Sequence, residues 1–188
     1  FKIIGHVETP HSYRLAQENG TYVLFKDGQA FRHGESKRFF LRYFDSAVRI
    51  TVAEFAVGRV FLHAGVAGWR GKAIVVPGDS FTGKTTLIAE LVRNGADYYS
   101  DEYAIFDENG MVHPFARKLA IRSRPEGDEV IEMTYPTAEE LGGKTGTVPL
   151  PVGCILITEF SDDADWSPQA LSQGQGLMNM LSQTIPIR

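Results

Sequence analysis

The stretch of sequence that most constrains this chain reads GDSFTGKT, from Gly78 to Thr85. Its glycines, lysine and threonine follow the G-x-x-x-x-G-K-T spacing of a phosphate-binding loop. An apolar, β-branched run at residues 73–76 precedes it, and apolar residues recur at helical spacing over residues 87–92. A strand, a glycine-rich turn and a helix in this order are the context that the motif requires.

The residue types of this motif suit the binding of a nucleotide. Glycine at position 83 can adopt a positive φ without a Cβ clash, so the N–H groups of the turn converge on an anion. The positive end of the following helix points to the same place. We expect Lys84 to reach the outer phosphates and the Thr85 hydroxyl to bind Mg²⁺. The predicted cradle consists of Gly78, Asp79, Ser80, Phe81, Thr82, Gly83, Lys84, Thr85 and Thr86.

The composition argues against several classes of protein. The 188 residues are 43% hydrophobic and 22% charged, as in a globular protein with a core of its own. The net charge of −4 argues against nonspecific binding to nucleic acid and against a polybasic membrane anchor. With Cys154 as the single cysteine, no intrachain disulfide can form. We therefore expect a cytoplasmic protein with neither a nucleic-acid nor a membrane partner.

The sequence before the motif predicts a small β-rich segment and a helix. A β-branched and aromatic run at residues 21–25, followed by Asp27-Gly28, predicts a β-hairpin. Residues 37–57 have the apolar periodicity of a helix. We therefore predict two parts, an N-terminal segment at 1–58 and a catalytic domain at 59–188.

The chain enters the motif through a predicted β-hairpin. Residues 59–67 and 72–76 have the character of strands, and residues 68–71 form a short turn between them. So short a connection implies antiparallel pairing. In most proteins with this motif the strand that enters the loop lies between parallel neighbours joined by helices. The hairpin therefore points to the smaller group of proteins in which this motif does not follow a parallel strand. We predict an α/β fold with a mixed sheet.

Several elements are predicted after the motif. The helix ends near Asn94-Gly95, and a short strand follows at residues 96–100. Residues 152–160 predict another strand and residues 168–181 a helix. A second "GKT" lies within residues 142–146, but no apolar strand precedes it, so this segment is interpreted as a flexible loop.

Two acidic residues and a histidine are candidates for chemistry beside the loop. Asp101 follows the strand at 96–100, at the edge where ligands bind in open α/β sheets. A carboxylate there can hold Mg²⁺ or accept a proton from an attacking hydroxyl. Glu102 comes next, and strand alternation turns only one of the two toward the site, so we expect different roles. His63, on the first hairpin strand, is either a satisfied core residue or a partner that orients Asp101.

From His63 to Phe106 the sequence resembles the catalytic domain of the HPr kinase/phosphorylase family, which shares its fold with phosphoenolpyruvate carboxykinases. The likeness rests on the strand with His63, the hairpin into GDSFTGKT, the helix end at Arg93-Asn94-Gly95, and the acidic pair. The intervals from His63 to Lys84 and from Lys84 to Asp101 match the family pattern. The resemblance implies Mg²⁺-dependent phosphoryl transfer from ATP to a serine hydroxyl of a peptide or protein.

The resemblance also implies roles for particular residues. Asp101 would be the general base, His63 would support it, and Lys84 would bind the β- and γ-phosphates. Thr85, Asp101 and Glu102 would hold the metal, with ATP and Mg²⁺ as cofactors. Because relatives assemble as hexamers, an oligomer of identical chains is expected.

Departures from the family pattern indicate a divergent member. Glu102 stands where the family usually has aspartate, and Thr86 where it commonly has glutamate. The family run L-E-I-R-G-x-G is only echoed by residues 119–122, on the acceptor side. This pattern favours the relatives that accompany peptide-modification gene clusters, lasso-peptide kinases among them. The alternatives are a nucleotide-binding regulator or ATPase without an acceptor, and a carboxykinase-like enzyme, for which the chain is short.

Overall fold

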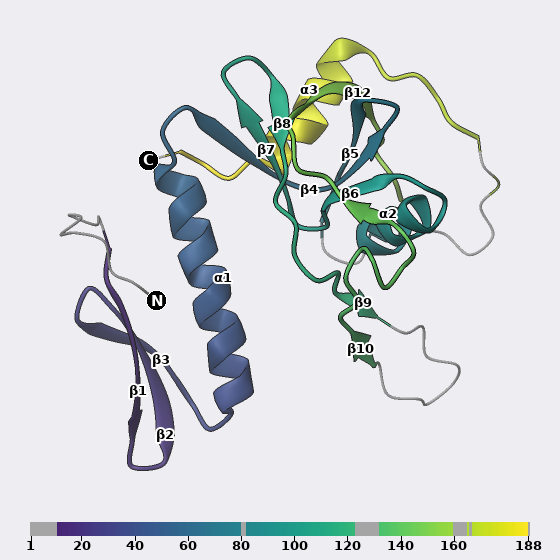
Figure 1. Ribbon diagram of the computed structural model, residues 1–188. Helices are drawn as coiled ribbons and strands as arrows, with labels where there is room; N and C mark the ends of the chain where they lie inside the picture. Colours follow the sequence, from purple (N-terminus) through teal and green to yellow (C-terminus); the bar gives the residue numbers. More distant parts are fainter. Residues whose placement is uncertain (1–10, 80–81, 123–131, 160–164, 166, 188) are drawn as a thin grey trace. The chain divides into compact units, whose positions relative to one another are not determined.

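The computed structural model describes two compact units of the chain (Figure 1). The first comprises residues up to Phe55 and the second Ala56–Ile187. The described residues are 11–79, 82–122, 132–159, 165 and 167–187. Within these ranges, no helix is both long and apolar enough to cross a membrane.

The first unit is a three-stranded antiparallel sheet followed by a long helix (Figure 1). Its elements are β1 (Tyr13–Glu18), β2 (Thr21–Lys26), β3 (Gln29–Gly34) and α1 (Lys37–Phe55). The predicted turn at Asp27-Gly28 is confirmed, with φ values of 52° and 79°. The ring of Phe40 on α1 is buried and stacks on Tyr22 of β2, so the helix covers the sheet through aromatic contacts.

Helix α1 is two residues shorter than the sequence predicted. Ser36 begins it, because its Oγ accepts a hydrogen bond from the Phe39 N–H at 3.3 Å. The helix ends at Phe55 rather than at Val57. Val57 is 97% exposed, so it has no apolar contact that would hold a further turn. Gly58 then adopts a left-handed φ of 64°.

The second unit is built on a seven-stranded mixed sheet. In spatial order the strands are β11 (Lys144–Thr145), β6 (Asp97–Ser100), β4 (Arg59–Trp69), β5 (Lys72–Pro77), β12 (Leu150–Ile155), β8 (Met111–His113) and β7 (Tyr103–Asp107). The β11–β6 and β12–β5 pairs are parallel and the other pairs are antiparallel. A separate antiparallel pair joins β9 (Ile121–Arg122) to β10 (Met133–Thr134). The predicted α/β class, the mixed sheet and the β4–β5 hairpin are therefore confirmed.

Two hydrophobic clusters cover opposite faces of this sheet. Neighbouring residues Val75 and Val76 belong to different clusters, because side chains alternate along a strand. Helix α2 (Lys84–Arg93) packs on the face of Val76. Helix α3 (Gln173–Ser182) contributes Met180 to the other face. The motif helix and the C-terminal helix therefore approach the same strands from different sides.

Strand β4 takes part in more pairings than any other described strand. Its first half pairs with β7 and its second half with β6, while β5 lies along its other side. Because β7 also pairs with β8, and β8 with β12, the strands β4, β5, β12, β8 and β7 form a closed circuit. The circuit encloses the cluster of Leu62, Ala64, Val66, Ala73, Val75, Tyr99, Ala104 and Val112.

Two predicted elements are shorter in the structure. The strand predicted at 152–160 ends at Ile155, and Phe160 lies outside the described residues. Its partner β5 ends at Pro77, which has no N–H to continue the ladder. The helix predicted from Pro168 begins only at Gln173, because Ser172 forms a capping box with Gln175.

Two residues of the segment at 142–146 belong to the sheet, so the interpretation of this segment as a flexible loop was wrong. Lys144 and Thr145 form β11, parallel to β6. The Gly146 N–H then donates to the Tyr98 carbonyl at 2.8 Å. The segment pairs with backbone groups of β6 that would otherwise have no partner strand. Side-chain periodicity does not predict such a pairing.

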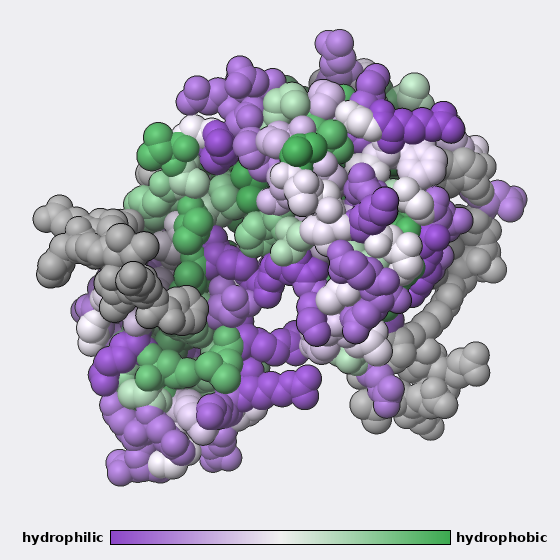
Figure 2. Space-filling view, in the orientation of Figure 1, coloured by the Kyte–Doolittle hydropathy of each residue, from purple (hydrophilic) through white to green (hydrophobic). Residues whose placement is uncertain are grey.

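Large hydrophobic side chains also reach the surface on the helices. Those of Phe39 and Val52 on α1 are 50% and 57% exposed, and those of Leu177 and Met178 on α3 are 57% and 67% exposed. Figure 2 shows hydrophobic side chains at the surface among hydrophilic ones.

Gly65 on β4 allows α2 to lie close to the sheet. A Cβ atom at this position would lie 2.6 Å from Cγ1 of Ile88 and 3.8 Å from Cβ of Lys84. Ile88 is fully buried and has no free volume into which to move. The glycine therefore sets the distance between β4 and the first turns of α2.

We expect Gly65→Ala to lower the free energy of unfolding by about 1–3 kcal/mol, because it overpacks this contact. Urea unfolding measures the change. The matched control is Gly176→Ala on α3, where a Cβ meets nothing within 4 Å. This control should be neutral or stabilise by up to about 1 kcal/mol. Equal effects of the two variants would contradict the close packing of α2 on β4.

Candidate functional site

The strand directions bring the motif and the acidic pair to one edge of the sheet. Because β5 and β6 are both antiparallel to β4, they run in the same direction on its two sides. The Gly78 N–H donates to the His63 carbonyl at 3.3 Å. On the opposite side of β4, the Ala64 N–H donates to the Glu102 carbonyl at 3.1 Å. His63 therefore lies between the phosphate-binding motif and the acidic pair.

The motif presents the N-terminus of α2 toward this edge. Gly83 adopts the left-handed conformation predicted for it, with φ 85°, and α2 begins at Lys84. Among the described residues, no side chain caps this helix end. Its first N–H groups therefore face outward, as the binding of an anion requires. Ser80 and Phe81, two of the predicted cradle residues, lie outside the described residues.

Lys84 is the buried cation of the site. It is 5% exposed, and its Nζ donates to the backbone carbonyl of Asp79. The hydroxyl of Thr82 donates to the same carbonyl at 2.9 Å. Burial lowers the pKa of Lys84, while the negative charges of Asp79 and Asp101 act in the opposite direction. Both carboxylates therefore lie within electrostatic reach of the ammonium group.

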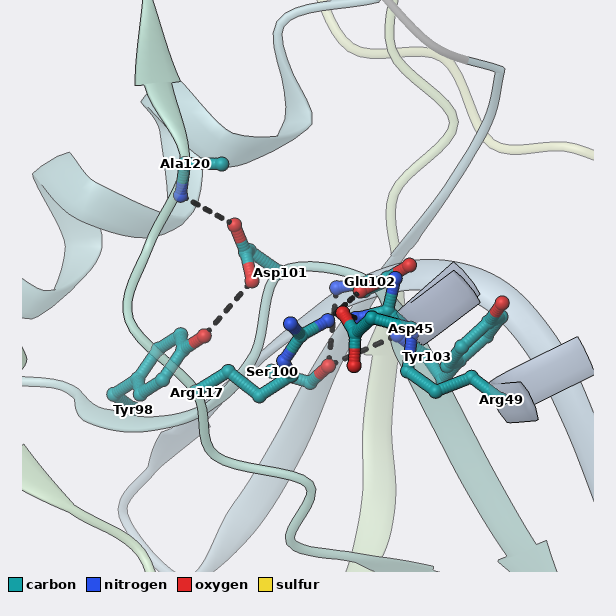
Figure 3. A network of polar contacts seen from close by, with 9 residues as sticks. All are labelled: Asp45, Arg49, Tyr98, Ser100, Asp101, Glu102, Tyr103, Arg117 and Ala120. Carbon is teal, nitrogen blue, oxygen red and sulfur yellow. Dashed lines mark hydrogen bonds and ion pairs between the residues drawn. The ribbon is translucent and has the colours of Figure 1, made fainter. Parts of the chain in front are cut away.

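The Asp101 carboxylate is held at both of its oxygens (Figure 3). The Tyr98 hydroxyl donates to Oδ1 at 2.9 Å, and the Ala120 N–H donates to Oδ2 at 3.0 Å. Burial raises the pKa of Tyr98, and the charge of Asp101 raises it further, so the phenol stays protonated and remains a donor. A carboxylate oxygen can accept a second hydrogen bond, so Asp101 stays available to a proton or a metal ion.

Glu102 has different partners from Asp101 (Figure 3). Its Oε2 accepts a hydrogen bond from Arg117 Nη1 at 2.6 Å. The Ser100 hydroxyl accepts from the N–H groups of Glu102 and Tyr103, at 3.0 and 2.9 Å. This turn ends β6 and separates the two acidic side chains, so that Asp101 is bound by Tyr98 and Ala120 and Glu102 by Arg117.

His63 is partly buried beside the phosphate-binding motif. Its imidazole lies 6.5 Å, centroid to centroid, from the Tyr103 ring. Burial and the charge of Lys84 lower the pKa of His63, against the opposing effects of Asp79 and Gln183. Asp101 accepts hydrogen bonds from Tyr98 and Ala120, and the support of Asp101 by His63 stays a prediction.

Three residues of this site were missed by the sequence reasoning. Tyr98 could have been named a candidate from the sequence, because it stands three residues before Asp101 on the strand that ends at the site. Ala120 contributes only its backbone N–H, which no residue type signals. Gln183 follows α3, 104 positions after Asp79, and only tertiary structure brings the two together.

The residues predicted to hold Mg²⁺ supply oxygen donors, which this ion prefers. Thr85 lies in the first turn of α2, and Asp101 and Glu102 follow β6 at the same edge. In the described part of the chain, no cluster of three or more His, Cys, Asp or Glu could hold a metal ion. An Mg²⁺ ion held by so few protein oxygens would need phosphate or water oxygens to complete its shell.

Comparisons of the chain with models of known protein families, with curated proteins and with solved structures found no match. A function for the chain therefore has to be inferred from the site itself and from the resemblance of its motifs.

The charges around His63 make its protonation a test of the site geometry. We expect the His63 imidazole to titrate below its ordinary value of about 6.5. Lys84→Met removes a positive charge, favours the imidazolium and should raise the pKa of His63. Asp79→Asn removes a negative charge and should lower it. Both changes are measurable by NMR, with the resonance assigned from a His63→Gln variant.

The matched control for this titration is Lys72→Met, at the far end of β5 from the motif. It removes the same charge and should leave the pKa of His63 unchanged. A shift in the opposite direction in either Lys84→Met or Asp79→Asn would contradict the arrangement of charges described above.

Proposed function

We propose that the chain is a Mg²⁺-dependent phosphotransferase that moves the γ-phosphoryl group of a nucleoside triphosphate, ATP by the resemblance, to a serine-type hydroxyl of a peptide or protein. The observation that carries the proposal is the meeting of Lys84, Asp79 and Asp101 at one sheet edge, where both carboxylates act on the pKa of Lys84. A phosphate-binding motif and a fixed carboxylate are the two parts that such a transfer needs.

Lys84 and the start of α2 account for nucleotide binding in this proposal. The ammonium group exchanges the Asp79 carbonyl for the β- and γ-phosphate oxygens, which are stronger acceptors because they are charged. The uncapped N–H groups after Gly83 bind the same phosphates. Mg²⁺, when bound, neutralises charge on the phosphates. Thr85, Asp101 and Glu102 are the residues that would hold it.

Asp101 is the group that would accept the proton. The acceptor hydroxyl oxygen forms a bond to the γ-phosphorus, the bond from that phosphorus to the β,γ-bridging oxygen breaks, and the hydroxyl proton passes to the carboxylate. Tyr98 and Ala120 fix the direction of the carboxylate before any substrate binds. Preorganisation of this kind is the main contribution that a protein makes to phosphoryl transfer.

One observation favours the alternative, a nucleotide-binding regulator or ATPase without an acceptor. Both oxygens of Asp101 already accept hydrogen bonds, and Arg117 pairs with Glu102. Such contacts are also expected of two carboxylates that only stabilise the local fold. The two functions differ in a measurable way. A kinase forms ADP in proportion to phosphorylated acceptor, whereas a regulator binds nucleotide without acceptor-dependent turnover.

Asp101→Asn separates the two chemical roles of the site. We expect it to lower phosphoryl transfer by about 10²- to 10⁴-fold, because the amide cannot accept the proton. Because Asp101 would also help to hold Mg²⁺, the affinity for the nucleotide is compared without the metal, where it should stay close to that of the wild type. Transfer to candidate peptides is followed by mass spectrometry and affinity by calorimetry. The control is Asp97→Asn, an exposed acid at the start of β6, which should leave both quantities unchanged. Normal transfer by Asp101→Asn would refute the assigned role.

Lys84→Met should have the complementary effect. It removes the cation that binds the outer phosphates, so nucleotide affinity should fall roughly 10- to 100-fold, the value of a charge-assisted hydrogen bond. Calorimetry with Mg²⁺ and ATP measures the change, and circular dichroism checks that the variant is folded. Unchanged affinity would show that the motif does not bind nucleotide through Lys84.

A further inference from the structure

The segment that follows α3 pairs with β4 directly beside the phosphate-binding motif. The His63 N–H donates to the Gln183 carbonyl at 2.8 Å, and the Ile185 N–H donates to the Phe61 carbonyl at 2.9 Å. An antiparallel bridge joins Leu62 to Thr184 between them. This pairing occupies the side of β4 that is left open where β5 ends. We call residues 183–185 the C-terminal segment.

The Gln183 side chain extends this contact into the motif itself. Its Nε2 donates to Asp79 Oδ1 at 3.3 Å. The same amide lies near enough to the His63 imidazole to act on its pKa, which it raises. An amide carries a donor end and an acceptor end, so one side chain can bridge a carboxylate and a ring N–H. Gln183 therefore links the second residue of the motif to β4.

Asp79 explains why this link matters. Its exposed carboxylate acts electrostatically on Lys84, the residue expected to bind phosphate. A carboxylate that is free to approach Lys84 competes with phosphate for the ammonium group and repels the incoming anion. The hydrogen bond from Gln183 holds this carboxylate toward the segment that pairs with β4.

We propose that Gln183 is a positioning residue of the phosphate site, which restrains Asp79 so that Lys84 remains available to the nucleotide. The C-terminal segment is then part of the site, although it is remote from the motif in sequence. The inference rests on the nucleotide binding in the proposed function and does not depend on transfer to an acceptor. It can therefore be tested by affinity alone.

Any coupling between nucleotide binding and the pairing of the C-terminal segment with β4 must be reciprocal. If the docked C-terminal segment favours nucleotide binding, bound nucleotide must stabilise the docked segment. The amides of His63 and Ile185, which are bonded across the pairing, report on it through hydrogen exchange. We expect Mg²⁺ and ATP to slow their exchange in the wild-type chain and to have a smaller effect in Gln183→Ala.

The main experiment measures the affinity of the full chain for Mg²⁺ and ATP by calorimetry. Gln183→Ala should weaken binding about two- to tenfold, the range of one neutral hydrogen bond. Gln183→Glu keeps the size of the side chain but places a negative charge beside Asp79, and should weaken binding further. Gln173→Ala, the same change at an exposed position of α3, is the matched control and should bind as the wild type does.

A double-mutant cycle separates a positioning role from a general loss of structure. In an Asp79→Asn background there is no carboxylate to restrain, so Gln183→Ala should no longer weaken binding. A purely structural role predicts the same loss of affinity in both backgrounds. Thermal unfolding of all variants confirms that each is folded at the temperature of the measurement.

The outcomes distinguish this inference from the proposed function. Nucleotide binding that is equal in Gln183→Ala and the wild type, or a loss that persists in the Asp79→Asn background, would overturn the role of Gln183 and leave the phosphotransferase proposal intact. Nucleotide binding without any transfer would refute the phosphotransferase and leave Gln183 to be judged by affinity. A wild-type chain that binds no nucleotide would overturn both.

Discussion

The backbone pairing of β4 is the constraint on which the second unit depends. On one side this strand bonds β7 and then β6, and on the other β5 and then the C-terminal segment. The changes of partner occur at the same place, around His63 and Ala64. On each side of β4 one partner ends where the next begins, so the ends of its neighbouring segments meet at one point. The candidate site lies at this point, where every neighbouring element ends or begins.

The end of β6 also explains why the two acidic residues have different hydrogen-bond partners. Ser100 accepts hydrogen bonds from the two backbone N–H groups that follow Asp101, and so forms the turn in which β6 ends. The turn directs one carboxylate to Tyr98 and Ala120 and the other to Arg117. The electrostatic balance at the edge then depends on Lys84: burial lowers its pKa, and the charges of Asp79 and Asp101 raise it. Both of these carboxylates accept hydrogen bonds from neutral donors. The burial of one cation is thus matched by the fixed positions of its counter-charges.

The parts of this arrangement that could be predicted from sequence are the local ones. GDSFTGKT, the hairpin before it and the position of Asp101 each follow from a few adjacent residues, and the hairpin and the φ of Gly83 were confirmed. Two local signals would have shortened the predicted elements. Pro77 has no N–H to continue the pairing with β12, and the capping box at Ser172 marks the start of α3. The pairing of β11 with β6, the N–H of Ala120 and the amide of Gln183 could not be predicted, because each depends on which distant segments meet.

The position of β11 has a consequence for the behaviour of the chain in solution. Strand β6 lies between β4 and the two-residue strand β11, and without β11 its outer backbone N–H and carbonyl groups would be open to pairing with another chain. Two residues, Lys144 and Thr145, cover Asp97 and Tyr98 and place a lysine at the exposed edge. So short a strand, with a charged side chain, is poorly suited to extend the sheet to a second molecule. It protects the strand that ends at the candidate site from edge-to-edge aggregation.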